Sequence, residues 1–311
     1  MKYIIVAVIA LLIIGGGFYF FQSSNLAVDN PDQTSTSTPV ISTTTEESGT
    51  AATTSTTFEV STERGADTVI GSSVNGTDIT AHHYGEGEDE LLFIGGIHGG
   101  YSWNTSLVAY ELMDYLEENP EAIPENITVT VIPVLNPDGL EKVTGSTERF
   151  VASDVSRSEA QRIAGRFNAN DVDLNRNFDC KWQPKSTWQT KTVSGGSEAF
   201  SEPESQAIEN YVVKNTPTAI VTWYSSAGGV YSSNCEKGVL PETKTITNLY
   251  ATAAKYSAHQ EFDYYEITGD MVNWFAAQNI PAISVLLTTH EVVEWEKNKA
   301  GVDALLKYYA D

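Results

Sequence analysis

Short runs of β-branched and aliphatic residues alternate, along most of the chain, with longer segments whose apolar residues recur at helical spacing. The short runs predict strands at 78–85, 91–97, 127–136, 218–226 and 282–289. The longer segments, several of which follow a Thr, Asp or Asn cap, predict helices at 104–119, 202–215, 243–259, 270–279 and 298–310. This alternation predicts an α/β fold with a mixed, mostly parallel central sheet and helices on both faces.

Two stretches, about 139–170 and 181–200, show no clear periodicity. We expect them to form loops over the carboxyl ends of the strands, because open α/β sheets place their binding sites there.

The first 57 residues have a different pattern. Tyr3–Phe21 is an uninterrupted run of 19 apolar and glycine residues preceded by Lys2, and it is long enough to cross a bilayer. We therefore predict a transmembrane anchor at 1–24 that leaves the rest of the chain outside the cytoplasm. A cleaved signal peptide and secretion are the alternative, since small residues follow the run.

A Ser/Thr-rich segment follows, and almost no large apolar side chains occur in it. It predicts a disordered stalk at 25–57, which leaves 58–311 as one large domain. The two cysteines of that domain, Cys180 and Cys235, are expected to form a disulfide outside the cytoplasm, with two free buried thiols as the alternative.

The formal net charge of -23 argues against binding to nucleic acid, which attracts clusters of Lys and Arg. We therefore expect contact with the membrane only through the N-terminal helix. The sequence predicts no particular oligomeric state.

Five motifs occur in a specific order: GGIHGG (95–100), NPDG (136–139), GRFNANDVDLNRNF (165–178), FSEPES (200–205) and YEITGDMVNW (265–274). With these motifs the chain resembles the zinc carboxypeptidases of the carboxypeptidase A type, in particular bacterial members that act on peptides or cell-wall peptides. The resemblance covers nearly all of 60–311 and implies the fold of that family.

The resemblance implies roles for several residues. His98 matches the first zinc ligand of the family, and Asp173 matches the carboxylate that orients this histidine. A second set of residues would bind the substrate: Arg166 polarises the scissile carbonyl, Asn175 and Arg176 grip the terminal carboxylate, and Tyr265 closes over it. The alternative for Asp173 and Arg176 is a purely structural buried cluster, and for Tyr265 ordinary packing.

The reactive positions of the family are replaced. The glutamate ligand expected shortly after His98 is Ser102, or Tyr101 if the spacing is three. Tyr224 stands where the second histidine ligand is expected, and Leu286 stands at the position of the general-base glutamate. Because serine and leucine cannot replace a zinc ligand or a base, and tyrosine is a poor zinc ligand, we predict that zinc is absent or weakly bound.

Other histidines offer no clear substitute. His82 and His83 are adjacent on a predicted strand and point to opposite faces, so surface or structural roles are expected. His290 and Glu291 follow the last strand and could reach the rim of the pocket, although a local hydrogen-bonded pair is expected there.

The sequence therefore predicts a membrane-tethered carboxypeptidase-like protein that is catalytically inactive and binds peptides with a free C-terminal carboxylate. Two alternatives stay open: an active zinc carboxypeptidase with a rearranged site, and a structural or interaction protein.

Overall fold

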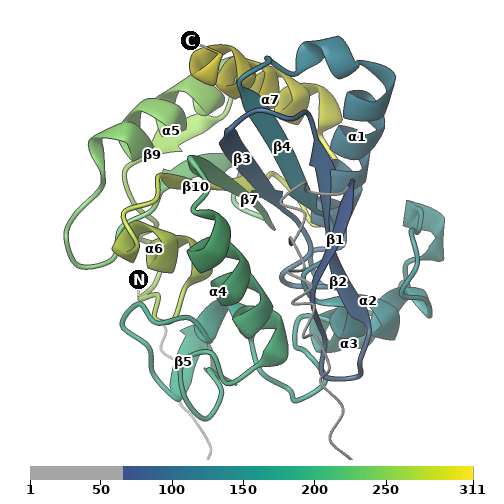
Figure 1. Ribbon diagram of the computed structural model, residues 1–311. Coiled ribbons are helices and arrows are strands. Elements are labelled where there is room, and N and C mark those ends of the chain that lie inside the picture. The colour runs from purple at the N-terminus through teal and green to yellow at the C-terminus, as the bar shows by residue number, and fades with distance from the viewer. Residues whose placement is uncertain (1–65, 311) are drawn as a thin grey trace, which may run out of the picture. The chain divides into compact units, whose positions relative to one another are not determined.

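The computed structural model describes residues 66–310, which are built on an eight-stranded sheet with the order β1-β2-β4-β3-β7-β10-β8-β9 (Figure 1). Its strands are β1 (Asp67–Ser72), β2 (Asp78–Tyr84), β3 (Asp89–Ile94), β4 (Ile127–Ile132), β7 (Ala219–Ser225), β8 (Gly229–Ser232), β9 (Ser257–His259) and β10 (Ala282–Leu287). Four of the seven pairings are parallel, including those that join β4, β3, β7 and β10 at the centre. The prediction of a mixed, mostly parallel sheet is confirmed.

Helices cover both faces of this sheet (Figure 1). Apolar residues of α1, α5 and α7 join one buried cluster, and those of α4 and α6 join the other. The helices are α1 (Asn104–Glu118), α2 (Pro137–Thr144), α3 (Glu159–Ala164), α4 (Pro203–Asn215), α5 (Pro241–Ala254), α6 (Met271–Ala277) and α7 (Trp295–Tyr309).

One aromatic contact ties the centre of the sheet to its helical cover. The rings of Phe93 on β3 and Trp223 on β7 stack with their centroids 5.6 Å apart. The indole Nε1 of Trp223 donates to Asn298 Oδ1 of α7 at 3.1 Å, so the polar atom of a fully buried side chain is satisfied. These two contacts fix the position of β7, whose carboxyl end reaches the pocket, relative to β3 and α7.

The two stretches expected to be loops are more ordered than predicted. The first contains most of α2 and all of α3, and the second contains a hairpin of β5 (Lys185–Trp188) and β6 (Lys191–Ser194). The helix predicted at 243–259 ends at Ala254, because Lys255 adopts a left-handed conformation with φ 57°. The three residues 257–259 then form the edge strand β9.

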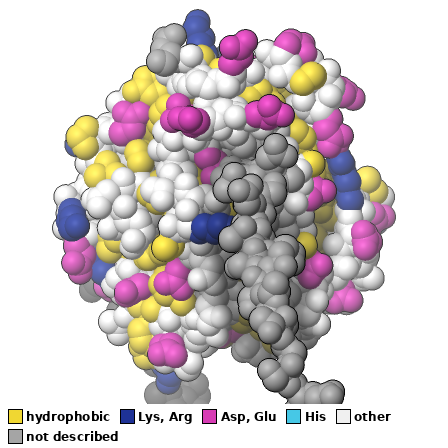
Figure 2. Space-filling model, in the orientation of Figure 1, with side chains coloured by type: hydrophobic (Ala, Val, Ile, Leu, Met, Phe, Trp, Pro, Cys, Tyr) yellow, Lys and Arg dark blue, Asp and Glu magenta, His cyan; other side chains and the backbone are white. Residues whose placement is uncertain are grey.

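The predicted anchor at 1–24 and stalk at 25–57 lie outside the described residues. Within 66–310, every helix is too short or too polar to cross a bilayer. On the face that Figure 2 shows, Asp and Glu side chains outnumber those of Lys and Arg, in keeping with the formal charge of -23.

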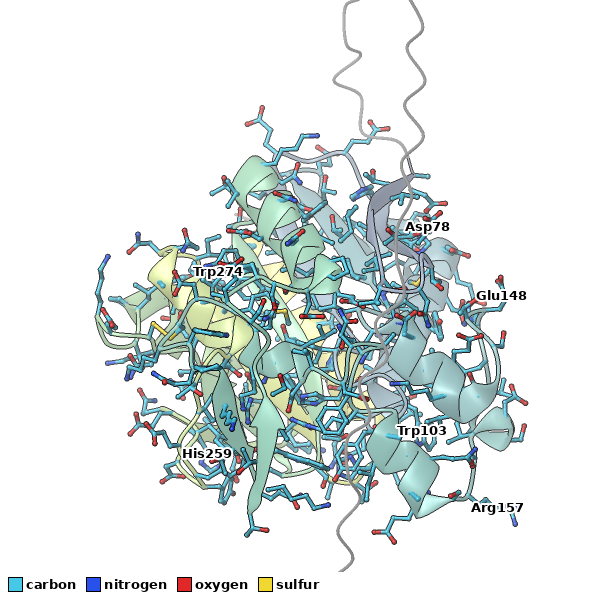
Figure 3. All side chains as sticks on the ribbon, turned by 90° about the horizontal axis from the view of Figure 1, so that it is seen from below. Asp78, Trp103, Glu148, Arg157, His259 and Trp274 are labelled. Atoms are coloured by element: carbon cyan, nitrogen blue, oxygen red, sulfur yellow. A yellow bond between two sulfur atoms is a disulfide. The ribbon has the colours of Figure 1, made fainter. Side chains whose placement is uncertain are left out.

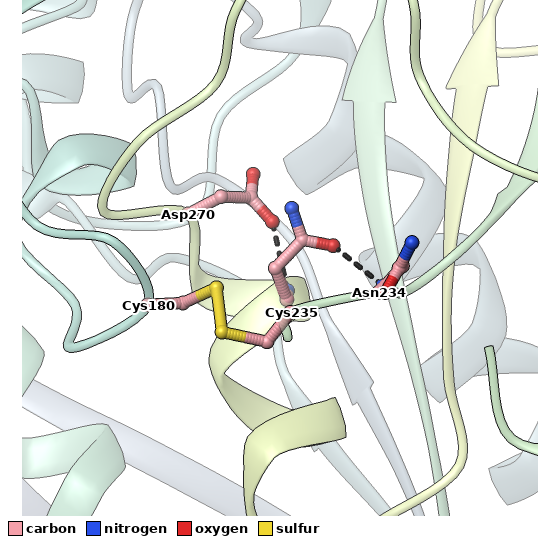
Figure 4. The surroundings of a disulfide bond; sticks show 5 residues. Cys180, Asn234, Cys235 and Asp270 are labelled. Carbon is pink, nitrogen blue, oxygen red and sulfur yellow. Dashed lines mark hydrogen bonds between the residues drawn. A yellow bond between two sulfur atoms is a disulfide. The ribbon is translucent and has the colours of Figure 1, made fainter. Parts of the chain in front are cut away.

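The predicted disulfide is present. Cys180 and Cys235 are bonded, with their Cα atoms 5.9 Å apart (Figure 4). The bond joins the segment that follows Arg176 to the segment that follows β8 and therefore connects two walls of the pocket described below.

We predict that removing this bond destabilises the domain. The bridge spans 55 residues, for which the chain-entropy account gives about 4 kcal/mol, and measured values are typically about 2 to 4 kcal/mol. The Cys180→Ser, Cys235→Ser double variant should therefore unfold at a lower denaturant concentration than the parent chain. Identical midpoints would contradict this expectation, as would quantitative alkylation of both thiols in the native protein without reductant.

Candidate functional site

A pocket of about 790 Å³ lies where β3, β7 and β10 end. Most of the residues singled out from the sequence line it, among them His98, Arg166, Asn175, Arg176, Tyr224, Tyr265 and Leu286. Segments far apart in the chain therefore meet at the carboxyl edge of the sheet, as expected for an α/β fold.

The NPDG motif starts helix α2, which packs against the backbone next to the pocket residue Arg166. Asn136 caps α2 by accepting from the N–H of Gly139 at 2.8 Å, and Pro137 occupies the first turn. A Cβ at Gly139 would lie 2.5 Å from the carbonyl oxygen of Gly165. The glycine therefore lets α2 pack directly against the backbone that precedes Arg166.

The FSEPES motif supports the same loop from its other side. Glu202 Oε2 accepts from the side-chain amides of Asn168 at 2.7 Å and Asn170 at 2.8 Å. These bonds fix the loop that leads from Arg166 to Asp173. The motif therefore positions site residues without lining the pocket itself.

Arg166 and Asp173 form a buried ion pair under the pocket. The Nε and Nη2 atoms of Arg166 donate to Asp173 Oδ2 at 2.9 and 2.8 Å, and both side chains are almost fully buried. Burial alone would raise the pKa of Asp173, but the positive charges of Arg166 and Arg176 hold it well below its usual range. Asp173 therefore stays ionised.

His98 is close to Asp173 but is not hydrogen-bonded to it. Its Nε2 lies 3.6 Å from Asp173 Oδ1, which is beyond hydrogen-bond length, and neither ring nitrogen has a hydrogen-bond partner within residues 66–310. The predicted orienting bond is therefore not formed, since Asp173 is turned to Arg166 and to the N–H of Asn175. Burial, with a further contribution from Arg166, lowers the pKa of His98 to about 3, so the ring is neutral.

Asn175 connects the pocket floor to α6. Its Nδ2 donates to Asp270 Oδ2 at 2.7 Å, and its Oδ1 accepts from the hydroxyl of Tyr224 at 3.1 Å. Asp270 also caps α6 by accepting from the N–H of Asn273 at 2.8 Å. The amide of Asn175 keeps one free hydrogen that can face a ligand.

Arg176 is held by the main chain. Its Nε and Nη2 donate to the carbonyl oxygen of Thr187 at 3.2 and 2.9 Å, and its Nη1 donates to the carbonyl of Asn175 at 2.6 Å. A guanidinium has five N–H groups, so these bonds leave one on each Nη. Arg176 is 1 % exposed yet lines the pocket, which gives it a fixed orientation toward a ligand.

All three replaced positions contribute a side chain to the pocket lining, namely Tyr101, Tyr224 and Leu286. Tyr101 lines the pocket, whereas Ser102 is 1 % exposed and its Oγ has no hydrogen-bond partner within 66–310. The structure therefore identifies Tyr101, three residues after His98, as the pocket-facing member of the pair. Leu286 presents an apolar surface at the expected position of the base.

The side chains present do not fit a zinc ion. A catalytic zinc site takes three protein ligands, and within 66–310 no group of three His, Cys, Asp or Glu side chains converges on one point. Tyr224 donates its proton to Asn175, and burial with the nearby Asp270 carboxylate raises its pKa well above the usual value. His98 is therefore one ligand without partners of suitable chemistry.

The remaining histidines have structural contacts. His82 pairs with Asp67 at 2.7 Å, and His83 is bonded between Thr68 and Thr130 on the sheet. Both positions are on β2, away from the pocket lining.

His290 does reach the rim of the pocket, but not as a pair with Glu291. Its Nδ1 lies 2.7 Å from Ser225 Oγ, while Glu291 pairs with Arg162 at 3.5 Å. The expected local pair is therefore wrong, because His290 turns to Ser225 and Glu291 turns to Arg162.

Several pocket residues were not identified from the sequence. Asp270 is almost fully buried beside Asn175, and burial raises its pKa. Asn234 and Trp188 line the pocket from segments that carry no motif. Asp270 does lie within the YEITGDMVNW motif, just before a helical pattern. That position is typical of a helix-capping residue and was the one signal in the sequence that could have identified it.

Comparison with curated proteins gives distant relatives. The chain is 24% identical over 220 residues to γ-D-glutamyl-L-diamino acid endopeptidase 1 of Lysinibacillus sphaericus, covering 64% of this chain and 54% of that protein. It is 24% identical over 212 residues to human carboxypeptidase D, covering 60% of this chain and 14% of that protein. The matches span about half of these relatives or less.

Solved structures share the fold. Murein-tripeptide amidase MpaA from Escherichia coli O157 aligns with a TM-score of 0.53 at 19% identity, covering 79% of this chain and 93% of that chain. Bovine thrombin-activatable fibrinolysis inhibitor aligns with a TM-score of 0.61 at 16% identity, covering 78% and 88%. The sequence profile of the zinc carboxypeptidases matches residues 60–293, three quarters of the chain, and the chain belongs to that family.

Proposed function

We propose that this chain is a membrane-tethered, extracytoplasmic member of the zinc carboxypeptidase family that binds the C-terminal carboxylate of peptides without cleaving them. The observation that carries the proposal is the contrast between two parts of one pocket. Arg166 and Arg176 are buried with N–H groups to spare, while Tyr101, Tyr224 and Leu286 occupy positions where the family needs zinc ligands and a base.

The charge of the pocket floor favours an anion. Arg166 is balanced by Asp173, whereas Arg176 is bonded to carbonyl oxygens and has no ionised partner at hydrogen-bond distance in the described residues. A carboxylate can accept both free Nη hydrogens of Arg176 in a forked geometry. Tyr265 lies beside this group, with the Arg176 guanidinium carbon 6.0 Å from its ring centroid.

The tether is proposed from the sequence alone. The apolar run Tyr3–Phe21 and the Ser/Thr-rich segment that follows would hold the domain away from the membrane surface. A tethered domain with an open pocket suits the capture of peptides outside the cell.

The first test compares a peptide acid with its amide. By calorimetry, the full chain in mild detergent should bind N-acetyl-dialanine about tenfold or more tightly than the corresponding C-terminal amide, because a charge-assisted bond contributes about 1.5 to 3 kcal/mol. Arg176→Gln should remove most of this preference. Tyr265→Phe, which retains the ring, should reduce it without affecting the buried network.

Arg149→Gln is the matched control, since Arg149 pairs with Asp114 on the exposed surface and takes no part in lining the pocket. Thermal unfolding of each variant separates loss of binding from loss of fold. Equal binding of acid and amide by the parent chain would contradict the proposal and favour a structural or interaction role.

The second test concerns the metal. We expect the purified chain, dialysed without chelator, to retain below about 0.1 zinc per chain by elemental analysis, because His98 lacks partner ligands. The Tyr101→Glu, Tyr224→His variant should gain zinc, whereas pairing Ser102→Glu with Tyr224→His should gain less. Adding Leu286→Glu to the first pair should produce chelator-sensitive release of the C-terminal residue.

About one zinc per unmodified chain, together with release of C-terminal residues that a chelator stops, would contradict loss of catalysis. That result would establish the alternative of an active enzyme with a rearranged site.

A further inference from the structure

The turn of the β5–β6 hairpin separates the pocket from a second cavity. Trp188 and Gln189, at this turn, line both the pocket and a smaller cavity of about 270 Å³. Trp103, which Figure 3 labels, lines the smaller cavity from the turn that follows His98. Open space on two sides of the hairpin turn leaves its position to a few specific contacts, because dense packing is possible only on the remaining sides.

One of these contacts joins the indole of Trp188 to the guanidinium of Arg166. The guanidinium carbon lies over the Trp188 ring, 4.5 Å from its centroid, which is within cation–π range. Both side chains are almost fully buried, and a cation–π contact is strongest where water is excluded. Asp173 binds the same guanidinium through its Nε and Nη2. The indole therefore restrains the plane of the group, while Asp173 sets its direction within that plane.

Two further rings support the indole. The ring of Tyr101 meets it edge to face, with centroids 4.9 Å apart and an interplanar angle of 84°. Phe167 meets it in the same way at 6.2 Å and 80°. Edge-to-face contacts are a favoured geometry for aromatic pairs. Tyr101 also lies 5.7 Å from the Arg166 guanidinium carbon, so a ring at one of the replaced ligand positions helps to hold this arginine.

The residue before Trp188 holds the other arginine of the pocket. The carbonyl oxygen of Thr187 accepts from the Nε and Nη2 of Arg176 at 3.2 and 2.9 Å. Because the two residues are adjacent in β5, a displacement of Trp188 also moves the acceptor that orients Arg176. Arg166 and Arg176 are thereby tied to one dipeptide of the hairpin, which fixes their free N–H groups relative to each other.

We propose that Trp188 is a positioning residue for carboxylate binding. Its ring acts through Arg166, and its place in β5 acts through the Thr187 carbonyl on Arg176. The inference rests on the proposed function, because its effect is measured as the preference for a peptide acid over its amide. It adds that this preference is set by an aromatic residue of the hairpin, outside the five motifs.

Two substitutions at Trp188 separate the ring from the volume that it fills. Trp188→Leu supplies apolar volume without a ring face, and Trp188→Phe retains the face. By calorimetry on the full chain in mild detergent, the leucine variant should bind N-acetyl-dialanine about tenfold more weakly than the parent chain, because the guanidinium loses its cation–π contact. The phenylalanine variant should stay within about threefold of the parent. The ratio of acid to amide affinity should fall in the leucine variant alone.

Tryptophan emission gives a readout that a purely structural role would not change. Binding of N-acetyl-dialanine should shift the emission of the parent chain, because it places a negative charge near the guanidinium that lies on the indole. Trp188→Phe, which still binds, should lose most of this shift. The matched control is Lys191→Gln, since Lys191 Nζ lies 5.3 Å from the centroid of the same ring but is exposed. The control should keep the parent affinity within about twofold.

The outcomes separate the two proposals. Equal affinities of the leucine and phenylalanine variants for the acid overturn the inference, as does a loss in the leucine variant that affects acid and amide equally. If the leucine variant does not fold, as judged by thermal unfolding, the emission of the parent chain decides, and an emission unchanged by saturating peptide overturns the inference. The proposed function is judged by the parent chain alone and fails only if that chain binds acid and amide equally.

Discussion

The buried ion pair between Arg166 and Asp173 is the interaction on which the pocket depends. Both side chains are almost fully buried, so removing either would leave an uncompensated charge and cost about 3 to 5 kcal/mol. The second oxygen of Asp173 accepts from the N–H of Asn175 and thereby fixes the turn that carries Asn175 and Arg176. An ion pair inside the fold therefore sets the direction of the residues that face a ligand.

Under the proposed function, this arrangement would let the scaffold persist without the chemistry of its family. The buried His98 is neutral, so it adds no positive charge that a carboxylate would have to balance. Tyr224 bonds to Asn175 and so adds a neutral hydrogen bond to the network on the pocket floor. The positive charge of Arg176 is thereby left available, which is the condition for binding an anion.

Much of the fold could be predicted from the sequence because its signals are local. Buried strands such as β3 and β4 are nearly continuous apolar runs, and the helices repeat apolar residues at the helical spacing. The short strands β5, β6 and β9 could not be predicted, since each contains only three or four largely polar residues, too few to show an alternating pattern.

The site was predictable to the extent that it lies within motifs. Spacing alone could not decide between Tyr101 and Ser102, because the turn after His98 determines which side chain faces the pocket. The link between Asn175 and Asp270 spans 95 residues and is visible only once the fold is known. Asp173 is hydrogen-bonded to Arg166 and not to His98. The sequence pattern could not predict which of the two it would bond, because this depends on the three-dimensional arrangement of the side chains.

The most direct test of the account is a crystal structure of the chain grown with both zinc and N-acetyl-dialanine, with anomalous diffraction measured at the zinc edge. The account predicts an intact peptide bond, a terminal carboxylate about 3 Å from the Arg176 Nη atoms, and no anomalous peak beside His98. A zinc peak bonded to His98, with a cleaved peptide in the pocket, would contradict it.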